Sequence, residues 1–354
     1  MTPSYRPFLK DTWKVAATFI GTVVGAGFAS GQEILKFFTH FGSGGIVGIS
    51  LCCLLFCVTG TTIMFLGNRL QAPSFGEVVR HVCGKRLGPV MDLLLGLFLF
   101  GTLSVMLAGS GAVFFQQWGL PFWLGTSVTL VISVLTVLFG LKGIIRVNSI
   151  VVPFMVLLCI LATLPAISTE IITANLQNFV PVASGAAPHW FLSALLYVSY
   201  NITLGVSVLA PLGKEIKNPP SLFWGGIAGG LSLGILAMLI NLAILSHYPD
   251  SAQYEVPSLF VAGRLAWVIQ LAFSFILWAE IFTTVIGTVY GLAVRIAGYA
   301  GINYILVTMV LMLMALGMSQ LGFSGLVGAL YPLFGYVSLA FLGCLLTLPF
   351  FKRR

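Results

Sequence analysis

Long runs of apolar residues, separated by short polar breaks, dominate the pattern along this chain. The runs are about 20 residues or longer, which is enough to cross roughly 30 Å of hydrocarbon as helices. They lack the alternation of apolar and polar positions that a membrane β-strand requires. The pattern therefore predicts an all-α polytopic membrane protein with ten spans, at residues 13–39, 44–67, 91–116, 121–140, 147–167, 189–213, 221–246, 258–296, 301–318 and 324–349.

Composition and charge support this topology. Hydrophobic residues make up 58% of the chain and charged residues only 7%, which excludes an ordinary water-soluble domain. The formal net charge is +8, and every Lys and Arg except Lys36 and Arg264 lies in or beside connections on one side of the predicted membrane. Because cytoplasmic connections are rich in Lys and Arg, both termini are predicted to be cytoplasmic. The expected partner is the lipid bilayer, and no nucleic acid partner is expected.

The two longest connections divide the ten spans into five plus five. The stretch "PSFGEVVRHVCGKRLG" follows the second span and is typical of an amphipathic surface helix, while the longest outside connection separates the fifth and sixth spans. Five is odd, so the second set must enter the membrane with the opposite orientation. The chain is therefore predicted to be a single transmembrane transporter domain, 1–354, with inverted repeats at approximately 13–167 and 189–349.

The first span contains the stretch "GTVVGAGFASGQE", residues 21–33, which carries four glycines and several polar groups. Glycine tolerates conformations that other residues avoid, so the helix is expected to unwind there and to let a ligand approach the backbone. The alternative is that these glycines are helix-packing contacts. The sixth span offers a matching interruption, "YVSYNITLG", around Asn201. Asn201 alone is equally typical of a hydrogen bond to a neighbouring helix.

Paired interruptions in equivalent spans predict a site for a small polar solute near the middle of the membrane. Freed N–H groups at the start of an outer half-helix favour an anionic group, and freed carbonyl groups favour a cation.

The eighth span adds a carboxylate and two hydroxyls, Glu280, Thr283 and Thr284, which share one helical face. Each threonine alone is more often satisfied by a preceding carbonyl group of its own helix. A carboxylate within the membrane must be paired, hydrated or protonated, so Glu280 is expected to have a function, and a structural hydrogen bond is the alternative.

Glu33 and Lys36, near the outer end of the first span, lie three residues apart on one helical face. An ion pair in an outer vestibule explains both residues about as well as a contact with the solute. The six cysteines show no metal-ligand spacing and are expected to be small buried apolar residues.

The stretch "GTVVGAGFASGQEILKFF" resembles the first-span signature of the YkvI-type bacterial membrane proteins, a family in the amino acid-polyamine-organocation superfamily of transporters. "YVSYNITLGVSVLAPLG" is similar to the same family, and "GTVVGAG" resembles the first-span turn of the leucine-transporter (LeuT) fold. That resemblance implies a five-plus-five inverted repeat with helices 1 and 6 broken around the substrate. It also implies a multi-pass protein of the bacterial cytoplasmic (inner) membrane.

The resemblance implies an ion site as well. In sodium-coupled members of the LeuT fold, carbonyl groups of the first span and two hydroxyls of the eighth hold a sodium ion. Matched by motif, the ligands are the carbonyl groups of Gly21 and Val24, the hydroxyls of Thr283 and Thr284, and the carbonyl group of Glu280, all hard oxygen ligands. The asparagine of a second sodium site corresponds here to Phe28, which puts that site in doubt. Glu280 leaves a proton as the alternative coupling ion.

The resulting hypothesis is a secondary active transporter of a small organic solute, an amino acid or related amine-containing compound, coupled to sodium or proton by alternating access. The expected substrate site comprises amides around Gly25, Ala26 and Gly27 for a carboxylate, Phe28 packed over it, and Tyr197, Tyr200 and Asn201. A membrane nutrient sensor with the same fold is the alternative. An enzyme is not expected, because no nucleophile and base pair is apparent, and no cofactor is expected beyond a sodium ion.

Overall fold

The computed structural model describes residues 5–72, 75–84, 88–139, 144–181 and 184–351, and these residues contain helices and connections without any strand. The helices of the first half are α1 (Tyr5–Val23), α2 (Ala26–Ala29), α3 (Gln32–Phe37), η1 (Thr39–Phe41), α4 (Ser43–Leu70), α5 (Phe75–Cys83), α6 (Gly88–Trp118), α7 (Phe122–Phe139), α8 (Ile144–Thr163), η3 (Leu164–Ala166) and α9 (Thr169–Gln177). Those of the second half are α10 (Trp190–Glu215), α11 (Pro219–Ser246), η4 (Asp250–Gln253), α12 (Pro257–Leu265), α13 (Trp267–Ala300), α14 (Tyr304–Ser319) and α15 (Phe323–Phe351).

Six helices in the described part of the chain are long and apolar enough to cross a membrane, and they belong to α4, α6, α10, α11, α13 and α15. Each overlaps a predicted span, but the eighth, 258–296, is divided into α12 and α13 because the backbone is extended at Ala266. Two shorter apolar helices, Phe122–Val137 and Tyr304–Ser319, coincide with the fourth and ninth predicted spans, and a bent pair, Val151–Ala166 with Thr169–Gln177, includes the fifth. The all-α membrane architecture is therefore confirmed, while the count of ten and the inverted repeat stay predictions.

Local sequence signals explain several of the helix boundaries. Two prolines, Pro219 and Pro220, open α11, where their missing N–H groups cost no hydrogen bond. Gly301 ends α13 in the left-handed conformation that glycine adopts without strain. The side chain of Asn303 then caps α14 by accepting a hydrogen bond from the N–H of Ile305. These stops keep α13 and α14 as separate antiparallel elements.

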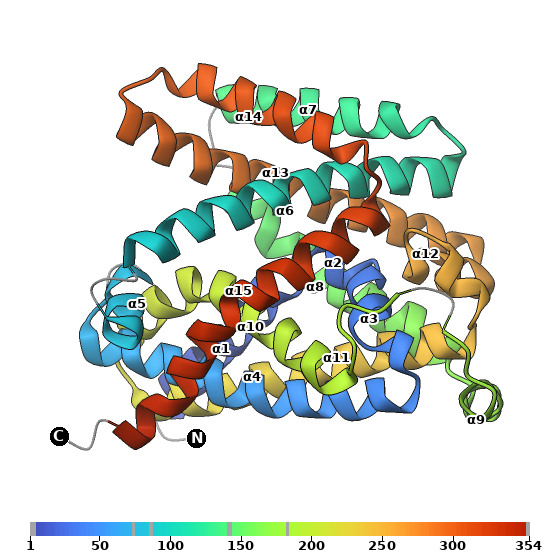
Figure 1. Cartoon of the computed structure of the whole chain (residues 1–354), viewed down its shortest axis with the longest axis horizontal. Coiled ribbons are helices and arrows are strands. Elements are labelled where there is room, and N and C mark those ends of the chain that lie inside the picture. The colour runs from blue at the N-terminus through green and yellow to red at the C-terminus, as the bar shows by residue number, and fades with distance from the viewer. Residues whose placement is uncertain (1–4, 73–74, 85–87, 140–143, 182–183, 352–354) are drawn as a thin grey trace.

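The helices form two packed groups (Figure 1). In one group α4 packs against α10 and α11, and α1 packs against α11 and α10. In the other, α13 packs against α6, α8 and α14, and α6 packs against α7. Helix α15 joins the groups by packing against both α10 and α6. The elements at the start of the chain therefore lie among helices from its second half.

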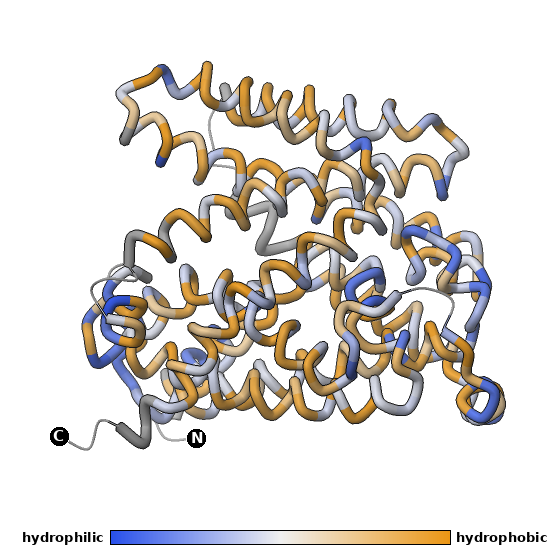
Figure 2. The backbone as a smooth tube through the Cα atoms, in the orientation of Figure 1, coloured by the Kyte–Doolittle hydropathy of each residue, from blue (hydrophilic) through white to orange (hydrophobic). Residues whose placement is uncertain are grey.

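The two ends of the molecule are polar and the region between them is apolar (Figure 2). Both chain ends lie at the end that carries α5, and α9 and α12 lie at the opposite end (Figure 1). This arrangement agrees with an even number of crossings. Of the basic residues predicted to face the cytoplasm, Lys85, Arg86, Lys142, Lys352, Arg353 and Arg354 lie outside the described residues. The side of the membrane on which the termini lie remains a prediction.

Glycines allow α4 and α10 to approach closely. A Cβ atom added at Gly67 of α4 would stand 2.1 Å from the carbonyl oxygen of Ala210. A Cβ atom added at Gly213 of α10 would stand 2.0 Å from the carbonyl oxygen of Met64. Neither position has room for a side chain, so the two backbones are in direct contact. Small residues at such contacts are what helix association in lipid favours.

Candidate functional site

The first predicted span is interrupted twice. Helix α1 ends at Val23, and Gly25 adopts an extended conformation with φ −114° and ψ −176° before α2 begins. After the four residues of α2, Gly31 takes φ 80°, a left-handed conformation that favours glycine. The predicted unwinding of "GTVVGAGFASGQE" is therefore confirmed, and it falls near the middle of the predicted span.

The first interruption frees backbone carbonyl groups. The N–H of Gly25 donates to the carbonyl oxygen of Val23 at 3.0 Å, so the carbonyl group of Gly21 loses its usual helical partner. The carbonyl groups of Thr22 and Val24 likewise receive no backbone N–H among the described residues. Gly21 faces α8, because a Cβ atom placed there would stand 3.3 Å from the side chain of Val152. Two of these carbonyl groups are the predicted ion ligands.

The same interruption frees backbone N–H groups. After Gly25, the next N–H with a backbone acceptor is that of Ala29, which donates to the carbonyl oxygen of Gly25 at 3.0 Å. The N–H groups of Ala26, Gly27 and Phe28 have no backbone acceptor within the described chain. A Cβ atom added at Gly25 would meet no atom within 4 Å, so open space adjoins the break. Donors and open space occur together, as an anion-binding role requires.

The predicted break in the sixth span is wrong. Helix α10 is continuous from Trp190 to Glu215, through the "YVSYNITLG" stretch. The side-chain amide of Asn201 donates to the carbonyl oxygen of Tyr197, four residues earlier, at 3.0 Å. The amide is thus satisfied within its own helix, and neither a ligand nor a neighbouring helix is needed to explain it. A single glycine, Gly205, does not interrupt the backbone hydrogen bonds of this helix.

The predicted substrate residues lie in two places. Helix α2, which carries Ala26, Gly27 and Phe28, packs against α13, α6 and α8. Helix α10, which carries Tyr197, Tyr200 and Asn201, packs against α1 and α3. All six residues are buried. The site is therefore enclosed in this structure, and the residue that links its two parts was not among the predicted substrate contacts.

That linking residue is Glu33, at the start of α3. Its Oε2 accepts a hydrogen bond from the hydroxyl of Tyr200 at 2.5 Å. Its Oε1 lies beside α2, where a Cβ atom added at Gly27 would stand 2.0 Å away. The side chain is only 6% exposed. The carboxyl group thus lies between the backbone that follows the break and the sixth span. Sequence analysis gave a contact with the solute as one of two interpretations of Glu33, but it contained no signal that identified Tyr200 as its neighbour.

The expected ion pair between Glu33 and Lys36 is not formed. The ion pairs found among the described residues are Lys14–Glu215 and Glu77–Arg80. Helix α3 is only six residues long, and its first turn directs Glu33 inward to Tyr200. Lys36 instead lies near α15, where a Cβ atom added at Gly328 would stand 3.7 Å from its Nζ. The placement of Lys36 in an outer vestibule stays a prediction.

The three polar residues of the eighth span meet their partners differently. The hydroxyl of Thr283 donates to the carbonyl oxygen of Glu280 at 3.1 Å, so the alternative of satisfaction within the helix applies to it. Glu280 is 3% exposed, and its Oε2 has no hydrogen-bond partner. It is close enough to the thiol of Cys159 on α8 to interact with it electrostatically. Thr284 is half-buried. The sodium site itself stays a prediction.

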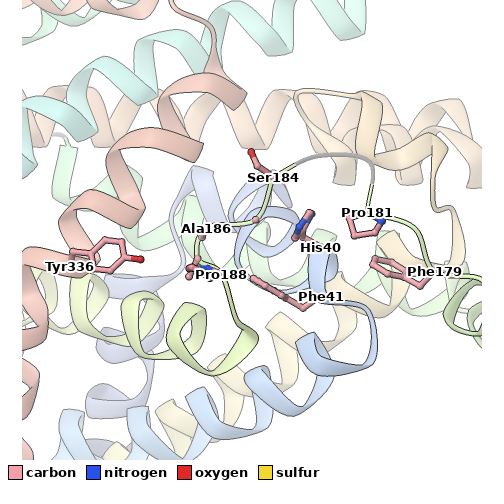
Figure 3. Close-up of a pocket in the computed structure, with 10 residues that line it drawn as sticks. His40, Phe41, Phe179, Pro181, Ser184, Ala186, Pro188 and Tyr336 are labelled. Atoms are coloured by element: carbon pink, nitrogen blue, oxygen red, sulfur yellow. The ribbon is translucent and has the colours of Figure 1, made fainter.

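A pocket of about 780 Å³ lies between η1, α15 and the connection that precedes α10 (Figure 3). It is lined by His40, Phe41, Phe179, Pro181, Ser184, Gly185, Ala186, Ala187, Pro188 and Tyr336. The connection is tied to the first span, because the N–H of Ala186 donates to the carbonyl oxygen of Lys36 at 2.9 Å. Burial, and then the nearby charge of Lys36, lower the pKa of His40. Sequence reasoning missed this pocket because residues distant in the chain form it.

Comparison with known proteins identifies relatives among membrane proteins. Residues 12–195 match the model of a family described as spore germination protein. The uncharacterized membrane protein YkvI of Bacillus subtilis (strain 168) is 34% identical over 344 residues, which are 96% of this chain and 97% of that protein. The resemblance on which the sequence expectations rest is thereby confirmed.

Solved structures of transporters share the fold. MhsT in complex with L-phenylalanine aligns with a TM-score of 0.64 at 16% identity, covering 96% of this chain and 89% of MhsT. A manganese transporter of Eremococcus coleocola aligns with a TM-score of 0.61 at 16% identity, covering 99% of this chain and 79% of that protein. At such identities the similarity concerns the fold alone, and the fold that this chain shares with these proteins is the LeuT fold.

Proposed function

This chain belongs to the spore germination protein family, and from that premise we propose that it is a secondary active transporter of a small organic solute. The solute is an amino acid or a related amine-containing compound. The observation that carries the proposal is the break at Val24 and Gly25, which leaves carbonyl and N–H groups unpaired inside a buried part of the membrane domain. Unwound backbone in lipid is tolerated where it lines a site or is buried in protein.

The free backbone groups suit the carboxylate of an amino acid and the positive charge of a coupling cation. The N–H groups of Ala26, Gly27 and Phe28 favour a carboxylate. The carbonyl groups of Gly21 and Val24 favour a hard cation such as sodium, with Thr284 as a further oxygen ligand. Glu280 offers a proton route instead, because a buried carboxyl group whose Oε2 has no hydrogen-bond partner changes its interactions with each change of protonation.

Coupling requires that the ion and the solute favour the same conformational state. Helices α1 and α2 meet different neighbours on the two sides of the break, since α1 packs against α10 and α11 whereas α2 packs against α13, α6 and α8. A ligand at the break therefore contacts both packed groups at once. Binding of a ligand at this position can therefore favour one relative placement of the two packed groups. Alternating access requires such a change in their relative placement.

A nutrient sensor is the second candidate, and the family match favours it specifically. In this role the same site binds a solute and passes a conformational change to a partner without net transport. Uptake separates the two functions. Purified protein is reconstituted in liposomes, and accumulation of labelled amino acids is measured with an imposed sodium gradient or proton gradient, against empty liposomes. Accumulation supports the transporter. Binding to the purified protein without accumulation contradicts the transporter and supports the sensor.

A further inference from the structure

The carboxyl group of Glu33 is buried. One of its oxygens accepts a hydrogen bond from the protein, and the other can accept a hydrogen bond from a ligand. Oε2 accepts the hydrogen bond from Tyr200 at 2.5 Å. Oε1 has no hydrogen-bond partner, and neither oxygen has a Lys, Arg or His nitrogen within ion-pair distance, among the described residues. Burial removes the water that would otherwise solvate this group. A carboxylate in these surroundings gains most from a donor that is itself positively charged.

The free oxygen faces the interrupted backbone. A Cβ atom added at Gly27 would stand 2.0 Å from Oε1 and 3.0 Å from Cδ of Glu33, so the carboxyl group lies directly against α2. Two residues earlier, Gly25 adjoins open space. Glycine at position 27 is what lets the carboxyl group come this near to the break. A solute bound at the break is therefore within reach of Oε1.

Aromatic rings surround the hydrogen-bonded tyrosine. The ring of Tyr200 lies 5.2 Å from that of Tyr331, 5.6 Å from that of Tyr197 and 5.7 Å from that of Phe37, measured between centroids. Tyr197 and Tyr331 are also close enough to Glu33 to interact with it electrostatically. The faces of aromatic rings attract cations, and Tyr is among the effective rings. A carboxylate within a group of aromatic rings is suited to an ammonium group.

We propose that Glu33 is the specificity-determining residue of the site and that it selects solutes carrying a protonated amine. Oε1 accepts a hydrogen bond from the ammonium group of the solute, while Tyr200 holds Oε2 and fixes the orientation of the carboxyl group. The inference rests on the proposed function in one respect, which is that the solute binds at the break of the first span. It does not depend on whether binding leads to transport.

Matched sets of probes test this selectivity on the wild-type protein. Each set contains an amino acid, the carboxylate that lacks its amino group, and the amine that lacks its carboxyl group, built on alanine, leucine and phenylalanine. Thermal stabilisation of the purified full-length chain is measured for each probe and for sodium chloride alone. We expect the amino acids and the amines of the same side chain to stabilise the protein. The carboxylates should bind at least about ten-fold more weakly.

Two substitutions then assign the selectivity to Glu33. Glu33→Gln keeps the shape of the side chain and removes its charge, and we expect it to weaken amine binding by at least about ten-fold. Glu170→Gln is the matched control, because Glu170 is exposed on α9 and far in sequence from the break. Tyr200→Phe removes the hydroxyl that orients the carboxyl group, and it should weaken amine binding less than Glu33→Gln does. Tyr290→Phe, at an exposed position on α13, is its control.

Each outcome decides the proposal. Equal stabilisation by amines and carboxylates overturns it, as does the absence of a response to every amine. An unchanged amine response in Glu33→Gln also overturns it, and if that variant does not fold, the wild-type comparison of probe sets remains decisive. Stabilisation by sodium chloride alone that disappears in Glu33→Gln makes Glu33 an ion ligand and overturns the proposal. Amine binding without uptake supports the role of Glu33 and contradicts the transporter. Uptake that is insensitive to Glu33→Gln supports the transporter and contradicts the role of Glu33.

Discussion

The hydroxyl of Tyr200 and the carboxylate of Glu33 are joined by a hydrogen bond of 2.5 Å between residues 167 positions apart in the chain. The contact ties the continuous sixth span to the short helix that follows the interrupted part of the first. Both side chains are buried, so the bond is shielded from competing water. A charge-assisted bond of this kind is stronger than a neutral one. It joins the part of the site on α10 to the segment that follows the break.

Tyr200→Phe tests the strength of this link. The substitution leaves the ring packing in place and removes the donor, so the carboxyl group of Glu33 keeps its burial without its partner. We expect the free energy of unfolding to fall by about 1.5–3 kcal/mol. The measurement is denaturant-induced unfolding in detergent, with Tyr290→Phe as the exposed control. An equal and small effect of both substitutions would contradict the role of the hydrogen bond.

Gly27→Ala tests the placement of the carboxyl group against α2. The added Cβ atom would stand 2.0 Å from Oε1 of Glu33, so the side chain must move and the bond to Tyr200 must change. We expect a loss of stability of about 1–3 kcal/mol, typical of overpacking. Gly25→Ala provides the structural comparison, because its Cβ atom meets no neighbour within 4 Å and its backbone is extended.

A double-mutant cycle makes this prediction specific. If Gly27→Ala already displaces the carboxyl group, adding Tyr200→Phe should cost less than it does in the wild-type background. Purely additive effects of the two substitutions on the free energy of unfolding would mean that Gly27 and the hydrogen bond are independent.

Sequence alone predicts the membrane architecture and the break in the first span, because both depend on local signals. Apolar runs define the spans, and closely spaced glycines such as Gly25 and Gly31 weaken the helix where no other residue compensates. The predicted break in the sixth span is wrong because the local signal there has another explanation. Asn201 finds its acceptor in the carbonyl group of Tyr197, so a polar residue that suggested an unwound helix is satisfied by an intact one.

The role of Glu33 depends on tertiary structure and could not be predicted from local spacing. The position of Lys36 three residues later indicated an ion pair about as well as a contact with the solute. The backbone turns at Gly31, just before α3, and brings Glu33 to Tyr200 instead. Both residues lie on the regular helix α3, so their spacing allowed an ion pair, but tertiary contacts place Glu33 against Tyr200 and Lys36 beside Gly328 of α15.

Glu280→Gln distinguishes the two coupling ions. If a proton couples transport, the substitution should abolish the dependence of uptake on the proton gradient, because the amide cannot exchange a proton. If sodium couples transport, Thr284→Ala should weaken the dependence on sodium by removing an oxygen ligand. Thr136→Ala is the control, since its hydroxyl bonds the carbonyl oxygen of Ile132 within its own helix. Uptake in liposomes is the measurement, and gradient dependence unchanged by either substitution would remove both residues from coupling.

Gly213→Ala tests the close contact between α4 and α10. The added Cβ atom would stand 2.0 Å from the carbonyl oxygen of Met64, a backbone atom that cannot move aside as a side chain can. We expect the helices to separate locally and the protein to lose about 1–3 kcal/mol of stability. Gly343→Ala, where the added atom meets nothing within 4 Å, is the matched control. Thermal unfolding of both variants is compared, and equal stability would refute the contact.

The ion pair between Lys14 of α1 and Glu215 of α10, at 2.6 Å, joins the first and sixth spans on the predicted cytoplasmic side. Its side chains are 45% and 62% exposed, so its contribution should be at most about 1 kcal/mol and should weaken with salt. A contribution of this size can hold the end of α10 against α1 without preventing the two helices from separating. We expect Lys14→Glu to increase hydrogen exchange at the end of α10, and the double substitution Lys14→Glu with Glu215→Lys to restore protection. Exchange that responds to neither substitution would show that the pair does not hold the end of α10 in place, whereas restoration by charge reversal would identify the attraction itself as the cause.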